Sequence, residues 1–547
     1  MPLFLRPRRF GKTLFTDILS EYYDIDTAED FEKLFGDTYI GKKPTAARNS
    51  YYILRFDFSG IDSAHLEKNF FDTVKNQLKI FCSKYSSLNL TVNENSVSPA
   101  SILEDLVTSF IVKRPHKTDQ IFVIIDEYDN FANDVLATDV EQFKSMTSAE
   151  CFVKNFYARL KALSGNSLSA IARFFITGVS SIMINSVTSG FNSKNISQHP
   201  DFNEMVGFTE EELRALIRQT LDLNSYEGLF TEDDLIDRLK LYFDGYSFSE
   251  IYSHHIFNSS MCINYLSRVK SLGRLTNNYS DANENLDTDK LSRLMSLIRK
   301  NERENLIKIV AHADERQDCI YSTLEENLNI NAETELSFEQ GVSILFYLGY
   351  LTYGLSENGR TIFRVPNLEF KKMFMKYYMS VFFMKGVLTG RFNNMSALEE
   401  TGDMSVFTDC LREVISGIIP DNEKDVTERA IVCIAGTLIL GNLEHCRTET
   451  EYEIWHNGHR TDKRADLVIL NRHRDRPSFL IEFKYIREKA VHSESARKRN
   501  ISKVKRTARE QLTEYMTDDR LKETPNLHKY IIVYAYNELF VEQLKEN

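Results

Sequence analysis

The sequence predicts an α/β protein in three parts. These are an N-terminal parallel sheet with helices on both faces, a helical, winged-helix-like middle region, and a second, smaller α/β domain at the C-terminus. In the first part, near-continuous apolar strands alternate with amphipathic segments. The middle part shows a helix–hairpin–helix pattern, and in the last part strands are grouped around helices. We place the three parts at residues 1–255, 256–400 and 401–547.

Four apolar segments of the first part are expected to be strands: PLFL (2–5), YYILRFDF (51–58), QIFVIID (120–126) and ARFFITG (172–178). Segments between them, such as SILEDLVTSFIV, repeat apolar residues at spacings of three and four, as amphipathic helices do. A strand that is apolar along its length is usually buried on both faces. The strands therefore predict a parallel sheet between two layers of helices.

The later parts are expected to mix helices with hairpins. GVSILFYLGYLTYGLSENGRTIFRVPNLEFKKMF predicts a helix, a hairpin that turns at Glu357–Gly359, and another helix, whereas the polar stretch 275–289 is expected to be a mobile loop. The last part should contain a helix over 427–440, strands within 448–484, a basic helical stretch, and the final strand HKYIIVYAY. WHNGH reads as a hairpin turn, and its two histidines do not make a metal site.

Composition limits the classes of function. The seven cysteines form no CxxC pair, so we expect neither a disulfide framework nor a cysteine zinc site, and a cytoplasmic setting fits best. No apolar run reaches the ~18 residues of a membrane span, and no signal peptide is evident, so no membrane partner is expected. The net charge of −12 means that contact with nucleic acid needs a local basic patch. A homo-oligomer is compatible with this composition.

A phosphate-binding pattern lies near the start of the chain, in RPRRFGKT. Gly11, Lys12 and Thr13 follow an apolar strand and precede the helical segment LFTDILSEYY. In such a loop, backbone N–H groups and a helix start face the phosphates, the lysine reaches the β and γ phosphates, and the hydroxyl holds Mg²⁺. The sequence thus predicts that ATP and magnesium bind here. The full pattern requires a glycine where this chain has Arg6.

Two further strands end in residues that suit nucleotide chemistry. The strand FVIID ends at Asp126, which is expected to support Mg²⁺ through water, and Glu127 follows to polarise the attacking water. The next strand ends at Thr177, which is placed to sense the γ-phosphate. The order strand–GKT, strand–DE, strand–T is that of an ATPase core. Alternatively, Asp126 caps a following helix and Thr177 simply ends its strand.

Five motifs carry a family resemblance: RPRRFGKT, IIDEYDN, FFITGVSSI, FNEMVGFTEEEL and YFDGYSF. In this order they resemble the AAA-ATPase-like domain that occurs beside a nuclease-like C-terminal domain, over about residues 1–270. The resemblance implies that RPRRFGK is the family's usual loop, with Arg9 among the nucleotide-binding residues. Arg6 and its neighbouring arginines either add positive charge near the phosphates or form local salt bridges. In YFDGYSF we expect Tyr246 and Phe248 to be core residues and Gly245 to supply a turn.

Members of this family usually carry a segment before the loop strand. Five residues precede Arg6 here, so we expect a chain that is shortened at its N-terminus or that starts at a different methionine. Such a shortening would weaken nucleotide binding, or leave only the nuclease active.

Two acids and a lysine mark the C-terminal part. Asp466, in ADLVIL, precedes Glu482 by sixteen residues, and Lys484 follows. Alternate residues of a strand share a face, so Glu482 and Lys484 should project together and Phe483 to the other side. With Asp466 on the neighbouring strand, these groups would hold Mg²⁺, which acidifies a bound water and stabilises phosphate charge. Lys484 would orient that water or the scissile phosphate. Alternatively, Glu482 and Lys484 are an exposed pair of opposite charge.

This pattern resembles the PD-(D/E)XK nuclease fold over about residues 405–547. The resemblance extends to Glu428, on a helix where such nucleases often place another acid, and to Gln511 with Tyr515 on a later helix. It implies a nuclease-like α/β domain in which Glu428 and Gln511 also serve catalysis. Otherwise Glu428 is a solvated helix acid and Gln511 a surface residue.

A basic run separates Glu482 from Gln511: Arg487, Lys489, Arg497, Lys498, Arg499, Lys503, Lys505 and Arg506. It suits contact with a phosphate backbone, or is a solvated loop. Taken together, the sequence favours an ATPase-like module coupled to a magnesium-dependent nuclease that acts on DNA, or else on RNA. The alternative is a nucleotide-regulated binding or regulatory protein in which the nuclease fold is silent.

Overall fold

The computed structural model describes residues 1–62, 64–138, 142–143, 151–164, 169–182, 194–226, 228–251, 254–275, 291, 294–303, 306, 320–326, 328, 335–354, 360–367, 369–370, 374, 395–422, 428–440, 443, 446–456, 459–486, 493–536 and 538–544. Contacts divide the chain into two compact units. The first contains residues 1–306 and 319–370, and the second contains residues 371–547 together with 307–318. Within the described ranges, no helix is long and apolar enough to cross a membrane.

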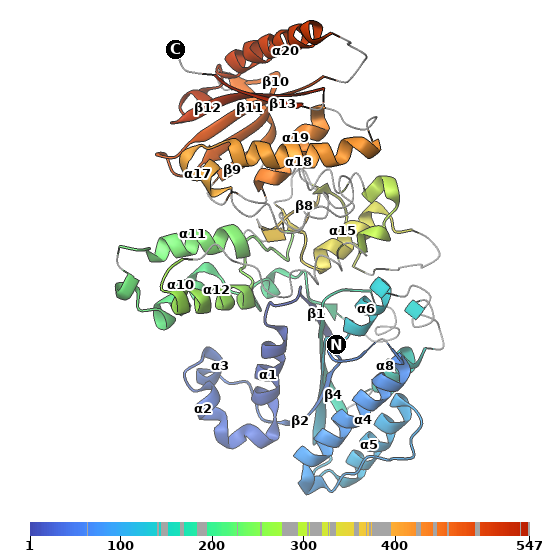
Figure 1. Cartoon of the computed structure of the whole chain (residues 1–547). Coiled ribbons are helices and arrows are strands. Elements are labelled where there is room, and N and C mark those ends of the chain that lie inside the picture. Colours follow the sequence, from blue (N-terminus) through green and yellow to red (C-terminus); the bar gives the residue numbers. More distant parts are fainter. Residues whose placement is uncertain are drawn as a thin grey trace. The chain divides into compact units, whose positions relative to one another are not determined.

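The first unit is built on a five-stranded parallel sheet (Figure 1). Its strands are β1 (Pro2–Leu5), β2 (Tyr51–Asp57), β3 (Gln120–Asp126), β4 (Ile171–Gly178) and β5 (Lys194–Asn195). They lie in the order β2-β3-β4-β1-β5, and every neighbouring pair is parallel. The four predicted strands and the parallel sheet are confirmed. The order places β4 between β1 and β3, which brings three strand ends to one edge.

Helices cover both faces of this sheet, as predicted (Figure 1). One face carries α1 (Lys12–Tyr23), and the other carries α4 (Leu66–Lys84), α5 (Pro99–Lys113) and α8 (Phe152–Ala162). Smaller elements complete the layers: η1 (Ile25–Asp30), α2 (Phe31–Phe35), α3 (Tyr39–Lys42), η2 (Ser86–Leu88) and α6 (Asn130–Thr138). Phe58 on the sheet packs against Phe70 of α4 and Phe156 of α8, which anchors that layer.

A helical subdomain follows the sheet. It contains η3 (Pro200–Phe202), α10 (Glu210–Thr220), η4 (Leu223–Tyr226), α11 (Glu232–Phe243) and α12 (Ser259–Leu272). Capping boxes start α10 at Thr209 and α11 at Thr231, and the Asn258 side chain caps α12. One hydrophobic cluster joins the three helices and continues to Val269. It therefore runs past the predicted domain boundary at 255, and that boundary stays a prediction.

The middle region contains a helix and a small antiparallel sheet. These are α15 (Phe338–Tyr347), β6 (Ile320–Tyr321), β7 (Thr352–Tyr353) and β8 (Ile362–Arg364), with the strands in the order β6-β8-β7. β7 pairs with β8 as the two arms of the predicted hairpin. Its turn at 357–359, most of the following helix and all but the first residue of the polar stretch 275–289 lie outside the described residues. The winged-helix interpretation stays a prediction.

The second unit is a mixed sheet between helices (Figure 1). Its helices are α17 (Ser396–Thr401), α18 (Ser405–Asn422), α19 (Glu428–Leu440), α20 (Glu494–Tyr515) and α21 (Asp519–Lys522). Its strands are β9 (Cys446–His456), β10 (His459–Asn471), β11 (Ser478–Ile486), β12 (Leu527–Ala535) and β13 (Glu538–Leu544). The order is β13-β12-β11-β10-β9, and only β11 and β12 are parallel.

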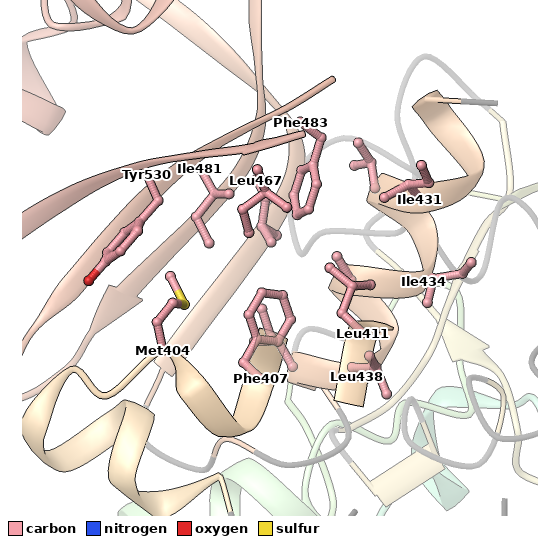
Figure 2. Packing of buried hydrophobic residues seen from close by; sticks show 14 of the residues in the cluster. Met404, Phe407, Leu411, Ile431, Ile434, Leu438, Leu467, Ile481, Phe483 and Tyr530 are labelled. Atoms are coloured by element: carbon pink, nitrogen blue, oxygen red, sulfur yellow. The ribbon is translucent and has the colours of Figure 1, made fainter. Parts of the chain in front are cut away.

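Strand alternation divides the side chains of β11 between two hydrophobic layers. Ile481 and Phe483 join Leu411 of α18 and Ile431 of α19 in one cluster (Figure 2). Leu480 joins Leu512 of α20 in the cluster on the opposite face. The odd-numbered residues of β11 thus face α18 and α19, and the even-numbered ones face α20. This confirms the predicted direction of Phe483.

Gly245 occupies a turn that no other residue can adopt without strain. Its φ is +95°, and a Cβ added to it would lie 1.9 Å from the carbonyl oxygen of Pro366. The turn places Tyr246 and Phe248 in the core, where they are 1% and 3% exposed, as predicted. Both rings pack edge-on against Phe10, in the loop between β1 and α1.

We expect Gly245→Ala to destabilise the first unit because it combines a backbone clash with a left-handed conformation. The loss should exceed the ~1 kcal/mol typical of a non-glycine residue in that conformation. Gly273→Ala is the matched control, since Gly273 has a φ of +68° but open space around it. Urea unfolding would compare the two, and equal losses would contradict the predicted clash.

Candidate functional site

The first site lies where β1, β3 and β4 end. The loop after β1 carries Gly11, Lys12 and Thr13, β3 ends at Asp126, and Thr177 is the penultimate residue of β4. Because neighbouring parallel strands end at the same edge, the three predicted motifs lie close together. Gly11 has a φ of +93° and directly precedes α1, so the amino end of α1 starts at Lys12.

Lys12 is held at the centre of this site. Its side chain is 3% exposed, and Nζ donates to the carbonyl oxygen of Pro7 at 3.2 Å. The same ammonium lies 3.2 Å from Oε1 of Glu127. The other oxygen of Glu127, Oε2, is buried and has no hydrogen-bond partner among the described residues. A cation and an incompletely satisfied carboxylate therefore face each other within the loop.

Asp126 is buried beside the amino end of α1. Burial raises its pKa, and a hydrogen bond with Thr13 partly offsets that rise. Thr16 Oγ1 lies 3.5 Å from Oδ2, and the Glu127 N–H donates to Oδ1 at 3.0 Å. A hydroxyl and a buried carboxylate in contact are a donor set that suits Mg²⁺, which also keeps several waters. Thr13 and Asp126 thus fit the predicted ion.

Thr177 and Asp129 lie behind these groups. The Thr177 hydroxyl is fully buried and finds no partner among the described residues. Asp129 accepts the N–H groups of Val179 and Ser180 at 2.9 and 2.6 Å, and also the Ser180 hydroxyl at 2.7 Å. Asp129 thereby fixes the chain that follows Thr177. Sequence reasoning missed it, although it is the third acid of IIDEYDN.

Arg55 is a second residue that sequence reasoning missed. Its Nη2 lies 3.6 Å from Oδ2 of Asp126 and donates to Thr16 Oγ1 at 3.1 Å, while Nη1 pairs with Asp17. The guanidinium thus links β2, α1 and the acid of β3, and it supplies positive charge to a buried carboxylate. The available signal was an arginine inside the otherwise apolar strand YYILRFDF.

Arg6 lies inside the core rather than at the surface of the loop. Its side chain is 1% exposed, and its guanidinium donates to three carbonyl oxygens, those of Leu5 (2.8 Å), Ser197 (2.7 Å) and Phe202 (2.7 Å). It stacks between the rings of Phe4 and Phe248, at 4.4 and 4.1 Å. Burial lowers its pKa to about 9. No salt bridge of Arg6 is found among the described residues, and its side chain instead joins β1, the segment of Ser197 and Phe202, and Phe248 from inside the core. A contribution of Arg6 to the charge near bound phosphates stays a prediction.

The other two arginines of the loop lie nearer the surface. Arg8 is half-exposed, and its Nη2 donates to Asn130 Oδ1 at 2.7 Å and lies 4.0 Å from Asp134. Arg9 has a φ of +72° and is partly exposed. The predicted local pairing thus describes Arg8, and the nucleotide-binding role of Arg9 stays a prediction.

The second site lies on β10 and β11. Leu467 pairs with Ile481 in antiparallel register, so Asp466 and Glu482 are cross-strand neighbours. The Phe483 N–H donates to Asp466 Oδ2 at 2.7 Å, which holds that carboxylate at the strand edge. Glu482 is 1% exposed. The predicted convergence of the two acids is thus present in the geometry.

Lys484 lies between acids from two elements. Its Nζ donates to Glu482 Oε1 at 2.8 Å and to Glu428 Oε1, at the start of α19, at 3.1 Å. The other oxygen of Glu428 accepts the Tyr485 N–H at 3.2 Å. The Lys484 side chain is 14% exposed, so the alternative of an exposed strand pair is wrong. Glu428 is partly exposed but bound at both oxygens.

Helix α20 contributes two polar side chains to this site. The Tyr515 hydroxyl lies 3.5 Å from Glu482 Oε1, and Gln511 Nε2 lies 3.5 Å from that hydroxyl. Glu482 Oε2 and Gln511 Oε1 are buried and lack partners among the described residues. Tyr515 was named in the sequence beside Gln511 but given no role, and its contact depends on how α20 packs over β11.

Burial and mutual repulsion perturb the acids of this site. Burial, with the nearby charge of Glu482, raises the pKa of Asp466 to about 8, and burial also raises the pKa of Glu482. Burial by itself would lower the pKa of Lys484, but the carboxylate of Glu482 and then that of Asp466 raise it. Two repelling carboxylates, one with an unsatisfied buried oxygen, suit a divalent cation.

No three His, Cys, Asp or Glu side chains are grouped closely enough to form a metal site by themselves in the described part of the chain. Asp466 and Glu482 would therefore supply two ligands, with water completing the shell, which is how Mg²⁺ is commonly bound.

Comparison with known protein families gives two matches, one around each candidate site. Residues 1–188 match the family model described as a predicted AAA-ATPase, AAA-ATPase-like, and residues 442–544 match the PD-(D/E)XK nuclease superfamily. The chain thus contains an AAA-ATPase-like domain and a C-terminal PD-(D/E)XK nuclease-superfamily domain. These two domains support an ATPase plus nuclease-type protein. A search of curated proteins finds no match.

The two matched segments contain most of the residues of the two candidate sites. The first ends after Thr177 and before α10, so the helical subdomain lies outside it. The second contains Asp466, Glu482 and Lys484 but begins after Glu428. Glu428 therefore reaches the nuclease-superfamily domain from a helix that precedes the matched segment.

We expect Arg6→Met to lower the free energy of unfolding by on the order of 3 kcal/mol, because it leaves three carbonyl oxygens without donors in the core. Arg6→Lys should recover only part of the lost free energy of unfolding, since an ammonium group cannot reproduce the planar guanidinium that stacks on two rings and donates to several carbonyls. Urea unfolding followed by circular dichroism would measure both. Full stability of Arg6→Met would contradict the central role of this guanidinium.

A pH dependence follows from the raised pKa of Asp466. The folded protein keeps this proton up to about pH 8, whereas the unfolded chain releases it near pH 4, so stability should fall as pH rises between those values. In EDTA, wild type should lose stability across this range relative to Asp466→Asn, with a slope of about one proton. Urea unfolding of both proteins at several pH values would measure this difference. If the free energies of unfolding of wild type and Asp466→Asn change with pH in parallel, the raised pKa of Asp466 is contradicted.

Proposed function

We propose that this protein binds ATP with magnesium at its N-terminal site and hydrolyses phosphodiester bonds of DNA at its C-terminal site. The observation that carries the proposal is the convergence of Asp466, Glu482 and Lys484 on two neighbouring strands, within a matched nuclease-superfamily domain. A nucleotide-dependent module in the same chain suggests that ATP controls cleavage.

At the nuclease site, Asp466 and Glu482 would hold Mg²⁺. When bound, such an ion acidifies a water and neutralises charge on the phosphate. Lys484 is within reach to orient the attacking water or the scissile phosphate, once it exchanges its contact with Glu482. Glu428 gives the lysine a second partner at 3.1 Å, and Tyr515 with Gln511 fixes the Glu482 carboxylate from α20.

At the nucleotide site, Thr13 and Asp126 would hold Mg²⁺, and Lys12 would bind the β and γ phosphates. Glu127, now paired with Lys12, would orient the attacking water when the phosphates take over that lysine. The unpartnered hydroxyl of Thr177 is a hydrogen-bonding group for the γ-phosphate. These roles rest on the meeting of loop, acids and hydroxyl at one edge of the sheet.

DNA is the proposed substrate because α20 is strongly basic. It covers the face of the sheet from which Glu482 and Lys484 project. Lys498 pairs with Glu494 at the surface, and such an exposed pair contributes little, so Lys498 remains available to phosphates. Lys505 and Arg509 both pair with Glu542, which is more buried. Binding should weaken steeply with salt.

The regulatory alternative has one specific observation in its favour. Lys484 pairs with both Glu428 and Glu482, and burial raises the pKa of Asp466 to about 8, so the charges of the site are partly balanced near neutral pH without a metal ion. A protein of this kind could bind nucleotide and a partner while its nuclease site stays silent. Direct assay of cleavage separates the two.

The deciding experiment measures cleavage of plasmid and single-stranded DNA with magnesium, with and without ATP. We expect Asp466→Ala and Lys484→Met to lose on the order of 10³-fold in rate, as is typical when a charge-stabilising group is removed. Lys12→Ala should keep the nuclease site but lose any response to ATP. Asp409→Asn is the matched control, since this acid of α18 is exposed and pairs only with Arg412 among the described residues.

Each outcome decides between the hypotheses. Cleavage that ignores ATP and Lys12→Ala would leave a nuclease without nucleotide control. A well-folded protein that cuts neither DNA nor RNA, yet binds ATP, would favour the regulatory protein. Activity that survives Asp466→Ala would point to a contaminating nuclease and overturn the assignment of this site.

A further inference from the structure

The loop between β1 and α1, residues 6–11 and here called the nucleotide loop, lacks the glycine that usually begins a phosphate-binding loop. Arg9 and Gly11 both have left-handed φ angles, of +72° and +93°. A non-glycine residue in that region is strained unless its surroundings hold it there. The residues that hold this loop belong to the helical subdomain.

Four consecutive carbonyl groups of the loop accept hydrogen bonds. The donors are Lys12 Nζ to Pro7 (3.2 Å), Asn258 Nδ2 to Arg8 (3.4 Å), Ser260 N–H (3.1 Å) and Ser259 Oγ (3.3 Å) to Arg9, and Gly207 N–H to Phe10 (3.0 Å). Three of these donors come from the first turn of α12. Asn258 and Ser259 are 3% and 8% exposed, so these contacts are shielded from water.

The direction of these carbonyls determines the direction of the loop's N–H groups. In a trans peptide, the carbonyl of one residue and the N–H of the next point to opposite sides. The carbonyls of Arg8 and Arg9 point toward α12, and that of Phe10 points toward Gly207. The N–H groups of the residues that follow each of them, Arg9, Phe10 and Gly11, therefore point away from those donors, as a loop that binds phosphate requires.

We propose that the first turn of α12, Asn258–Ser260, positions the nucleotide loop and so helps to determine its affinity for a polyphosphate. The inference rests on the proposed nucleotide binding and adds residues that lie outside the matched ATPase segment. These residues do not touch the phosphates. They orient the peptide groups that do, in place of the missing glycine.

The same turn links the loop to the helical subdomain. Asn258 has two roles, since its Oδ1 caps α12 through the Met261 N–H at 3.3 Å while its Nδ2 binds Arg8. α12 packs with α10 and α11 in one hydrophobic cluster. Phosphate binding at the loop and order in the first turn of α12 should therefore strengthen each other.

Asn258→Asp separates the two roles of this side chain. An aspartate keeps the oxygen that caps α12, but it has no donor for the Arg8 carbonyl. We expect affinity for ATP and for inorganic tripolyphosphate to fall by the same factor, about tenfold for one lost hydrogen bond. The melting temperature should fall modestly, because the shielded Arg8 carbonyl loses its donor, so Ser259→Ala is needed to separate affinity from stability. Binding would be measured by isothermal titration calorimetry on the full chain.

Three further variants sharpen this test. Ser259→Ala removes the hydroxyl donor without touching the cap and should also weaken both ligands, whereas Ser259→Thr keeps the hydroxyl and should bind as wild type does. Thr209→Asp is the matched control, because Thr209 caps α10 in the same subdomain but has no described contact with the loop. It should leave affinity for tripolyphosphate unchanged.

Hydrogen exchange distinguishes a positioning role from a purely structural one, because only a positioning role predicts that ATP changes the exchange rate in the first turn of α12. ATP should slow exchange of the Ser260 amide in wild type and slow it less in Asn258→Asp. Wild-type affinity in both Asn258→Asp and Ser259→Ala, with loss in Lys12→Ala, would overturn the role of α12 and leave the proposed function intact. Wild type that binds neither ATP nor tripolyphosphate would overturn both. If Asn258→Asp lowers the melting temperature, the affinity of Ser259→Ala for tripolyphosphate decides whether the first turn of α12 positions the loop.

Discussion

The buried guanidinium of Arg6 is the interaction on which the nucleotide site depends. It joins β1, the segment that contains Ser197 and Phe202, and the ring of Phe248 after the Gly245 turn. A buried cation is tolerated there because three carbonyl oxygens and two aromatic faces replace its water. Arg6 therefore anchors the start of the loop in the core, while the carbonyl groups further along the loop are held by other donors.

Charge burial organises the nuclease-superfamily domain in a different way. Asp466 and Glu482 lie at cross-strand positions, where burial and mutual repulsion raise the pKa of Asp466, and Lys484 is their nearest cation. Such a site stores unfavourable electrostatic energy that a divalent ion can relieve. Glu428 and Tyr515, from α19 and α20, hold the members of this cluster in place from both ends.

The two sites share a design in which a second layer of side chains orients the first. Arg55 and Thr16 support Asp126, Asp129 fixes the chain after Thr177, and the first turn of α12 supports the loop. Each supporting residue comes from an element distant in sequence. Under the proposed function, such links are where one site can respond to changes elsewhere in the same unit.

The sequence by itself determined the strands, the main helices and the residues at the strand ends, because apolar runs and alternation depend only on local order. Lys12, Asp126, Asp466, Glu482 and Lys484 were predicted from the short motifs that contain them and from the strands around those motifs. The role of Arg6, the contacts of Arg55 and Asn258, and the link from Tyr515 to Glu482 were decided only by the tertiary structure. These depend on sheet order and on helix packing over a strand, which bring together residues separated by many positions and leave no periodic signal in the chain.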